Sequence, residues 1–145
     1  MGSSEQVSFG YRSISPFVEI MDSTLRDGEQ TNGVSFLPHE KLMIARMLLR
    51  DINIDRIEVA SARVSEGEKD AVRMICRYAE SNGMRDRVEV LGFVDGRLSI
   101  DWINDCGGRV INLLAKGSLK HCKQQLHKTP EEHIGDIMRV LDYAD

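Results

Sequence analysis

The sequence predicts an α/β fold in which parallel strands alternate with helices, and two observations support this prediction. Short β-prone runs and amphipathic stretches with helical spacing follow one another along the chain, and this order occurs four times. In addition, 145 residues with 41% apolar and 29% charged side chains are typical of one globular domain. Strands separated by helices pair in parallel through right-handed crossovers, so the expected sheet is parallel.

The expected elements are placed by their apolar spacing and by the residues that begin helices. Pro38 suits the first turn of the first helix. Ser65 with Glu68, and Thr129 with Glu132, have the spacing of a capping box and mark the start of two further helices. The predicted strands are 17–21, 56–60, 88–94 and 110–114, and the predicted helices are about 38–51, 65–82, 99–106 and from 130 onward.

Two folds agree with this order: a doubly wound open sheet, and a TIM (β/α)8 barrel, which needs about 250 residues and would be half present. Polar side chains interrupt the apolar strands at Glu19, Glu58, Glu89 and Asn112. A strand that is covered on both faces tolerates polar side chains only where one face meets a polar interior. The alternative explanation is that some strand ends are exposed to solvent. No Gly-x-Gly-x-x-Gly or Walker loop indicates a nucleotide-binding doubly wound domain.

We therefore predict parallel βα repeats that form the first four units of a truncated barrel. Residues 17–145 would be the amino-terminal half of a TIM-barrel catalytic domain, and residues 1–16 a flexible polar leader. The chain also stops inside an amphipathic helical pattern, which agrees with a truncated barrel. A half barrel leaves its first and fourth strands as open edges, so we expect self-association into a homo-oligomer.

Composition and charge exclude several classes of partner. Nineteen basic and 23 acidic residues give a formal net charge of −4, which lacks the positive charge that nucleic-acid binding requires. The longest apolar runs are a few residues, far short of a membrane span. The three cysteines are odd in number and form no Cys-x-x-Cys, as expected for reduced thiols. We expect a cytoplasmic protein that binds neither nucleic acid nor membranes.

The polar string from Asp22 to Gln30 is the strongest candidate for a functional site. It follows the first strand, and α/β enzymes place their chemistry at the carboxyl ends of strands. The Asp27 carboxylate could bind a hard divalent cation, and the Arg26 guanidinium could hold a carboxylate or an oxyanion. An Arg-Asp pair in a loop is also a common surface ion pair, and the spacing alone leaves both interpretations open.

The string 22–30 reads Asp-Ser-Thr-Leu-Arg-Asp-Gly-Glu-Gln and resembles the opening motif of the DRE-TIM metallolyases. Within that family it is similar to the branch of 2-isopropylmalate, citramalate and homocitrate synthases. The resemblance covers nearly the whole chain from Phe17, and its later motifs are most similar to the citramalate synthases. These later motifs are 31–36, 59–63, 91–96 and 112–118.

The resemblance implies an acyltransferase that joins acetyl-CoA to a 2-oxo acid in a metal-assisted Claisen-type condensation. It implies Asp27 as a ligand of a divalent metal (Mg, Mn or Zn), and Arg26 as the catalytic residue that orients the 2-oxo acid. Gln30 is a second candidate catalytic residue, and Thr24 would orient its neighbours. The alternative is that Gln30 and Thr24 only form hydrogen bonds within the loop and have no catalytic role.

Leu91 and Leu114 are candidate substrate-binding residues, because the resemblance places them at strand ends that face the site. They would form a small apolar pocket for the methyl group of pyruvate, which would give citramalate; both could instead be core residues. The alternative substrate is 2-oxoisovalerate, which would give 2-isopropylmalate. The histidines have no metal-ligand spacing, and we expect all four on the surface: His39, His121, His127 and His133.

Relatives complete the metal site with a His-x-His pair on a later strand, and we also expect the glutamate of the family motif farther along than residue 145. The catalytic site of this chain would then be incomplete, and the chain alone inactive. A different class of function is a non-catalytic half-barrel assembly module, in which Arg26 and Asp27 hold ions for structural reasons only.

Overall fold

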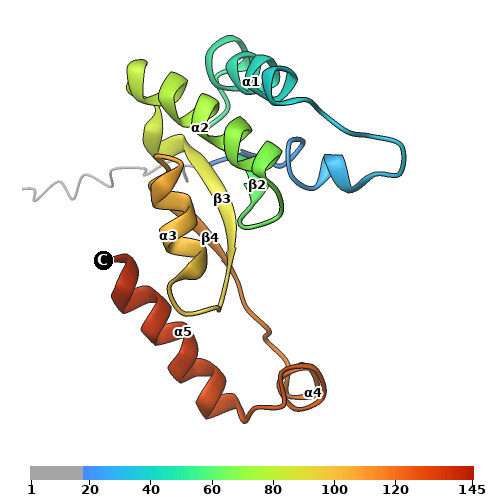
Figure 1. Cartoon of the computed structure of the whole chain (residues 1–145), viewed down its shortest axis with the longest axis vertical. Coiled ribbons are helices and arrows are strands. Elements are labelled where there is room, and N and C mark those ends of the chain that lie inside the picture. Colours follow the sequence, from blue (N-terminus) through green and yellow to red (C-terminus); the bar gives the residue numbers. More distant parts are fainter. Residues whose placement is uncertain (1–17) are drawn as a thin grey trace, which may run out of the picture.

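The computed structural model describes residues 18–145, which form a sheet of four parallel strands with helices between them (Figure 1). The strands are β1 (Met21–Asp22), β2 (Arg56–Ser61), β3 (Val88–Phe93) and β4 (Val110–Leu114). The helices are α1 (Pro38–Arg46), α2 (Glu66–Ser81), α3 (Leu98–Asp105), α4 (Leu119–His121) and α5 (Pro130–Ala144). The predicted α/β class with parallel βα repeats is confirmed. The predicted leader 1–16 and Phe17 lie outside the described residues.

The strand order decides between the two folds that the sequence allowed. Within the described sheet the order is β1-β2-β3-β4, and each pair is parallel. A doubly wound sheet reverses its strand order at a switch point, whereas a barrel adds each new strand on the same side. The sheet therefore corresponds to consecutive strands of a barrel.

The apolar core lies between one face of this sheet and helices α1, α2 and α3. Alternate strand residues point into it, because successive side chains of a strand face opposite ways. Those from β2 and β3 are fully buried and pack against apolar residues of the helices. The strand residues are Ile57, Val59, Val88 and Val90, and the helix residues include Ala45, Leu49, Val72, Ile75 and Ile103.

The opposite face of the sheet carries the polar residues that the sequence placed there. Glu58 and Glu89 are register partners on β2 and β3; Glu58 is fully buried and Glu89 nearly so. Asn112 on β4 donates a hydrogen bond to Glu58 over 2.8 Å. Glu19 differs, because its side chain is half exposed and pairs with Arg56 at 3.3 Å.

The predicted first strand is shorter than expected and begins later. The predicted strand was 17–21, whereas strand pairing covers Met21 and Asp22. The backbone of Ile20, just before this strand, forms two hydrogen bonds with the segment that leads into β2. The Ile20 N–H donates to the Asp55 carboxylate (2.7 Å), and its carbonyl accepts from the Arg56 N–H (3.2 Å). A side-chain acceptor thus takes the place of a strand partner at this position.

Helix starts agree closely with the capping residues read from the sequence. Thr129 and Glu132 form a complete capping box at the start of α5. At α2 only half of the expected box forms: the Ser65 hydroxyl accepts from the Glu68 N–H (3.1 Å). The Glu68 carboxylate turns instead to Lys41 on α1, at 2.6 Å.

The region after β4 contains the largest departures from the predicted structure. Residues 119–126, where the sequence predicted neither a helix nor a strand, form α4 and a following π-helical turn, Cys122–Leu126. Figure 1 shows this turn standing away from the sheet and α5 running back beside α3. His133 on α5 is 5% exposed, and its Nε2 accepts from the Lys116 N–H (3.2 Å), so its predicted surface position is wrong; the other three histidines are exposed. No helix within residues 18–145 has the length and apolar character to cross a membrane.

Candidate active site

The loop that follows β1 is held in a tight turn by its own backbone. The Ser23 carbonyl accepts hydrogen bonds from three successive N–H groups, those of Arg26 (3.1 Å), Asp27 (2.8 Å) and Gly28 (3.1 Å). A short 3-10 turn, Gly28–Gln30, follows directly. The turn presents Arg26 at the carboxyl end of β1, which is the end of the sheet where α/β enzymes place their sites.

Thr24 helps to close this turn. Its N–H and its hydroxyl both donate to the carboxylate of Asp22, at 2.9 and 3.0 Å. This is the local hydrogen bonding by which an Asp side chain stabilises a turn. Thr24 therefore acts on the shape of the loop, and its proposed orienting effect on Arg26 or Asp27 stays a prediction.

The Arg26 guanidinium lies between two carboxylates. Its Nη1 donates to Asp27 Oδ1 at 2.7 Å, and its Nε donates to Glu58 Oε2 at 2.6 Å. The other oxygen of Glu58 accepts from the Asn112 amide, so both Glu58 oxygens have a partner. The exposed fraction falls from 61% for the Asp27 side chain through 20% for Arg26 to zero for Glu58. These four residues form a polar row, which leads from Asn112 on β4 through Glu58 on β2 to Arg26 and Asp27 in the loop.

Glu58 is the site residue that the sequence analysis did not assign. It was recognised as a polar residue inside an apolar strand, whereas the glutamate of the family motif was expected beyond residue 145. The structure provides a glutamate in contact with Arg26 within the chain. The available signal was physical: a carboxylate inside an apolar strand requires a cation nearby, and Arg26 stood in the motif.

A cavity of about 360 Å³ opens beside Arg26, between the loop and the start of α2. Arg26 and Gln30, the two candidate catalytic residues, both line it. The remaining lining includes Ala60, Ser61, Val34, Val64, Glu29 and Glu68. The cavity therefore combines a fixed guanidinium, an amide and small apolar side chains, which could bind a small anionic molecule with a short apolar group.

The two leucines predicted to bind substrate lie apart from this cavity. Leu91 is buried on the inner face of β3, beside Asn112, its register partner on β4. It is therefore one strand away from the Arg26 and Glu58 pair. Leu114 is 44% exposed and lines a separate hollow of about 180 Å³ together with Phe93. The structure thus brings Leu91 near the polar row and leaves Leu114 outside it.

The described residues do not by themselves form a metal site. Within the described chain, no group of three or more His, Cys, Asp or Glu side chains is arranged to hold a metal ion. Asp27 offers one exposed carboxylate, and a usable site needs several rigidly held ligands. Charge around the loop still favours a cation, because two cationic side chains face four carboxylates, a formal balance of −2. The cations are Arg26 and Lys41, and the carboxylates are Asp27, Glu29, Glu58 and Glu68.

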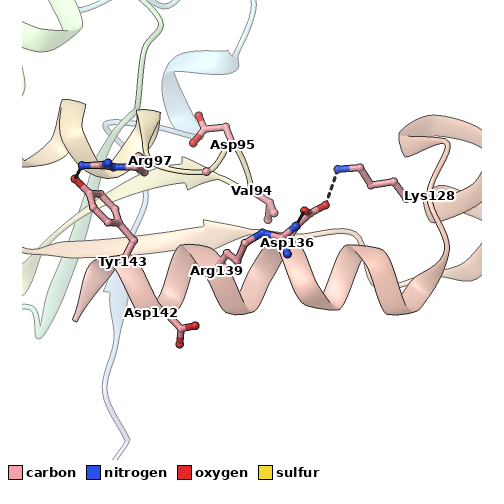
Figure 2. A pocket seen from close by; sticks show the side chains of 9 residues that line it. Val94, Asp95, Arg97, Lys128, Asp136, Arg139, Asp142 and Tyr143 are labelled. Atoms are coloured by element: carbon pink, nitrogen blue, oxygen red, sulfur yellow. Dashed lines mark hydrogen bonds and ion pairs between the residues drawn. The ribbon is translucent and has the colours of Figure 1, made fainter.

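A larger cavity, of about 630 Å³, lies between the connection from β3 to α3 and helix α5 (Figure 2). Most of its charged groups already have a partner. Arg97 stacks on the Tyr143 ring, 4.2 Å from its centre, and donates to its hydroxyl. Asp136 accepts from Lys128 (2.5 Å) and from Arg139, and the Lys128 hydrogen bond in particular lowers the pKa of its carboxyl. The cavity beside Arg26 therefore stays the candidate site.

The family of the chain follows from comparison with known proteins. The family model described as HMGL-like matches residues 17–145, which is most of the chain. The chain belongs to the HMGL-like family. The resemblance to the DRE-TIM metallolyases is thereby confirmed, and so is the interpretation of the four βα units as part of the barrel of this family.

Several curated relatives from the HMGL-like family are similar over 88% of the chain. The (R)-citramalate synthase CimA of Methanocaldococcus jannaschii is 36% identical, and the match covers 25% of that protein. The homocitrate synthase AksA of Methanopyrus kandleri is 40% identical, with 30% of its length covered. The 2-isopropylmalate synthase of Pyrococcus furiosus is 34% identical, with 25% covered.

These matches bear on the reaction class and leave the substrate open. The chain spans about a quarter to a third of the length of the curated relatives that it matches. Relatives with three different names have similar identities, so sequence identity does not select among their substrates. Their shared feature is that each is named as a synthase, which agrees with an acyltransferase of this family.

Proposed function

We propose that this chain is the amino-terminal half of the catalytic barrel of an acyl-CoA condensing enzyme, and that it holds a 2-oxo acid. The observation that supports this most directly is the Arg26 guanidinium, fixed at the carboxyl ends of the strands between Asp27 and the buried Glu58. An arginine held in this way presents its remaining donors in one direction at a cavity. Its planar fork matches a carboxylate, which a lysine would not do.

In the proposed reaction acetyl-CoA loses a methyl proton, and the resulting enolate attacks the ketone carbon of the 2-oxo acid. Negative charge then develops on the former ketone oxygen, and later hydrolysis of the thioester releases CoA. Arg26 orients the 2-oxo acid and stabilises this charge with donors that are already in place. Gln30 lines the same cavity, where its amide can position the acid or a water molecule.

We propose Asp27 as one ligand of a divalent ion (Mg, Mn or Zn). The excess of carboxylates around the loop and the exposure of Asp27 support this. A bound ion of this kind would supply Lewis-acid polarisation of the ketone oxygen. Its other ligands would come from outside residues 18–145, since the described residues contain no three-ligand group.

Pyruvate is the 2-oxo acid that we favour, which would make the product citramalate. Ala60, Val34 and Val64 give the cavity beside Arg26 an apolar surface suited to a methyl group, and Leu91 lies outside that cavity. The second candidate is 2-oxoisovalerate, with 2-isopropylmalate as the product, and the names of the relatives include both synthases. One or two methylene groups are worth only about 1–3 kcal/mol in such a pocket, so this preference has to be measured.

The test is the binding of pyruvate and of 2-oxoisovalerate to the chain, measured by calorimetry with Mg²⁺ or Mn²⁺ present. Arg26→Lys should weaken binding of the preferred acid at least tenfold, because a point charge replaces the planar fork. The matched control is Arg109→Lys, since Arg109 is exposed and lies outside the cavity. A well-folded chain that binds neither acid would instead support the non-catalytic assembly module.

The remaining partners follow from the same proposal. Acetyl-CoA is the proposed second substrate. Homo-oligomer formation stays a prediction that rests on β1 and β4 as the outer strands of the described sheet. A cytoplasmic location also stays a prediction.

A further inference from the structure

Lys41 on α1 is the most deeply buried cation among the described residues, with 1% of its side chain exposed. Its ammonium group has three acceptors: Glu29 Oε2 at 2.5 Å, Glu68 Oε1 at 2.6 Å and the Leu25 carbonyl at 3.1 Å. An ammonium group has three N–H donors and no acceptor. All three donors of Lys41 are therefore used, and each points to a different residue.

These acceptors connect Lys41 to the loop that carries Arg26. Leu25 directly precedes Arg26, and its side chain is also fully buried. Glu29 lies in the 3-10 turn that follows, and its second oxygen accepts from the Phe36 N–H at 2.8 Å. Lys41 thus holds the backbone on one side of Arg26 directly, and on the other side through Glu29.

The third acceptor fixes Lys41 itself. Glu68 lies in the first turn of α2, where its side chain could have completed the capping box of that helix. It reaches Lys41 instead, so α1, α2 and the loop meet at one ammonium group. The Glu68–Lys41 ion pair thus takes the place of a helix cap that would have stabilised only α2.

Stability alone is a poor explanation for this cluster. Burying the Lys41 ammonium together with two largely buried carboxylates is costly, and apolar side chains of similar volume often stabilise such a site equally well. The cluster also carries two carboxylates for one cation. What it provides is a defined position for the backbone beside Arg26, which an apolar contact would specify less strictly.

We propose that Lys41 is a positioning residue for Arg26. By holding the Leu25 carbonyl and Glu29, it keeps the loop in the turn from which the Arg26 guanidinium reaches Glu58. This inference depends on the proposed function only for the ligand that the Arg26 guanidinium would bind. Lys41 itself touches no substrate in this proposal; it acts through the loop.

The test compares Lys41→Met with Lys69→Met in the ¹⁵N-labelled chain. Methionine has an unbranched side chain, one atom shorter than that of lysine, and carries no charge. Lys69 is the matched control, because it follows Glu68 on α2 and forms its ion pair away from the loop. Its ammonium group pairs with Asp105 at 3.5 Å. A triple variant, Lys41→Met with Glu29→Gln and Glu68→Gln, removes the unpaired carboxylates in case the single variant unfolds.

Two signals report on the loop. The first is hydrogen exchange of the three N–H groups that bond to Ser23, those of Arg26, Asp27 and Gly28. In Lys41→Met or the triple variant their exchange should become at least tenfold faster relative to the amides of β3. The second is the Nε–H resonance of Arg26, which should shift or broaden as its hydrogen bond to Glu58 loosens. Lys69→Met should change neither signal.

A uniform rise of exchange in the loop and in β3, with an unchanged Arg26 Nε–H resonance, would show that Lys41 only stabilises the fold and would overturn the proposal. Neither signal requires a ligand. If the chain binds no 2-oxo acid while the loop signals still follow Lys41, the proposed function fails and the positioning role stands.

Discussion

Glu58 determines where the Arg26 guanidinium can lie. A carboxylate without access to water is costly unless it is paired and hydrogen-bonded. Glu58 meets this need with Arg26 Nε on one oxygen and the Asn112 amide on the other. Asp27 is mostly exposed, so its pairing with Arg26 is screened by water and contributes less. Arg26 is therefore directed toward the sheet rather than into solvent.

Replacing Glu58 by Gln tests this arrangement. The free energy of unfolding should fall by about 1–3 kcal/mol, because a buried hydrogen bond to a charged group is lost. Binding of the 2-oxo acid should weaken at least tenfold, since Arg26 is no longer held at the cavity. Urea denaturation measures the first effect and calorimetry the second.

Glu89→Gln is the matched control for this change. Glu89 is the register partner of Glu58, is also buried, and pairs with Arg56 at 2.8 Å, away from the cavity. It should cost a comparable amount of stability and leave binding unchanged. Equal loss of binding in both variants would show that Glu58 acts only through the stability of the sheet.

Sequence patterns identified polar residues inside apolar strands, but not which of them meet. For Glu58, Glu89 and Asn112 the sequence allowed either a polar interior or exposed strand ends, and the structure places all three on the inner face. The contact between Arg26 and Glu58 joins positions 32 apart in the chain, and no local pattern encodes such a pairing. The loop motif identified Arg26 and Asp27, whereas Glu58 could be recognised as the partner of Arg26 only from the structure.

At the scale of elements, strong local signals were predicted well and weak ones were missed. Pro38, Ser65 and Thr129 marked helix starts correctly, because capping is decided by neighbouring residues. Residues 119–126 were missed, since this short polar segment lacks an apolar stripe of helical period. His133 was misplaced because its burial depends on the loop after β4, whose Lys116 N–H it accepts.

Gly92 leaves room for the Ile111 side chain of β4 and for α3. It is buried on β3, and a Cβ added there would clash with Ile111 Cδ1, lie 2.8 Å from Ile111 Cγ1 and lie 3.2 Å from Ser99 Cβ on α3. Gly92→Ala should therefore destabilise the protein by about 1–3 kcal/mol through overpacking. Urea denaturation gives the value. Gly117→Ala is the control, because an added Cβ there meets nothing within 4 Å and should change stability by less than about 0.5 kcal/mol. Equal effects would contradict the close approach.

At the scale of the whole molecule, the two faces of the sheet have different roles. One face packs against α1, α2 and α3 and forms the apolar core. The other carries the polar row that ends at Arg26, and its Leu114 is 44% exposed. A closed barrel would place this second face in its interior. Within the described residues Glu58 holds Arg26 against this face, and no group of three metal-ligating side chains is present. Under the proposed function this face would form one wall of the site.

We therefore expect the chain alone to show no condensing activity. Asp27 is a single carboxylate, and a divalent ion held by one protein ligand and water is bound too weakly to be positioned for catalysis. The measurement is the release of free CoA from acetyl-CoA in a thiol-detection assay, with pyruvate or 2-oxoisovalerate and with Mg²⁺, Mn²⁺ or Zn²⁺. The (R)-citramalate synthase of Methanocaldococcus jannaschii serves as the positive control. CoA release above the protein-free rate that depends on the 2-oxo acid and is lost in Arg26→Lys would contradict this expectation, because it would show that these residues suffice for the reaction.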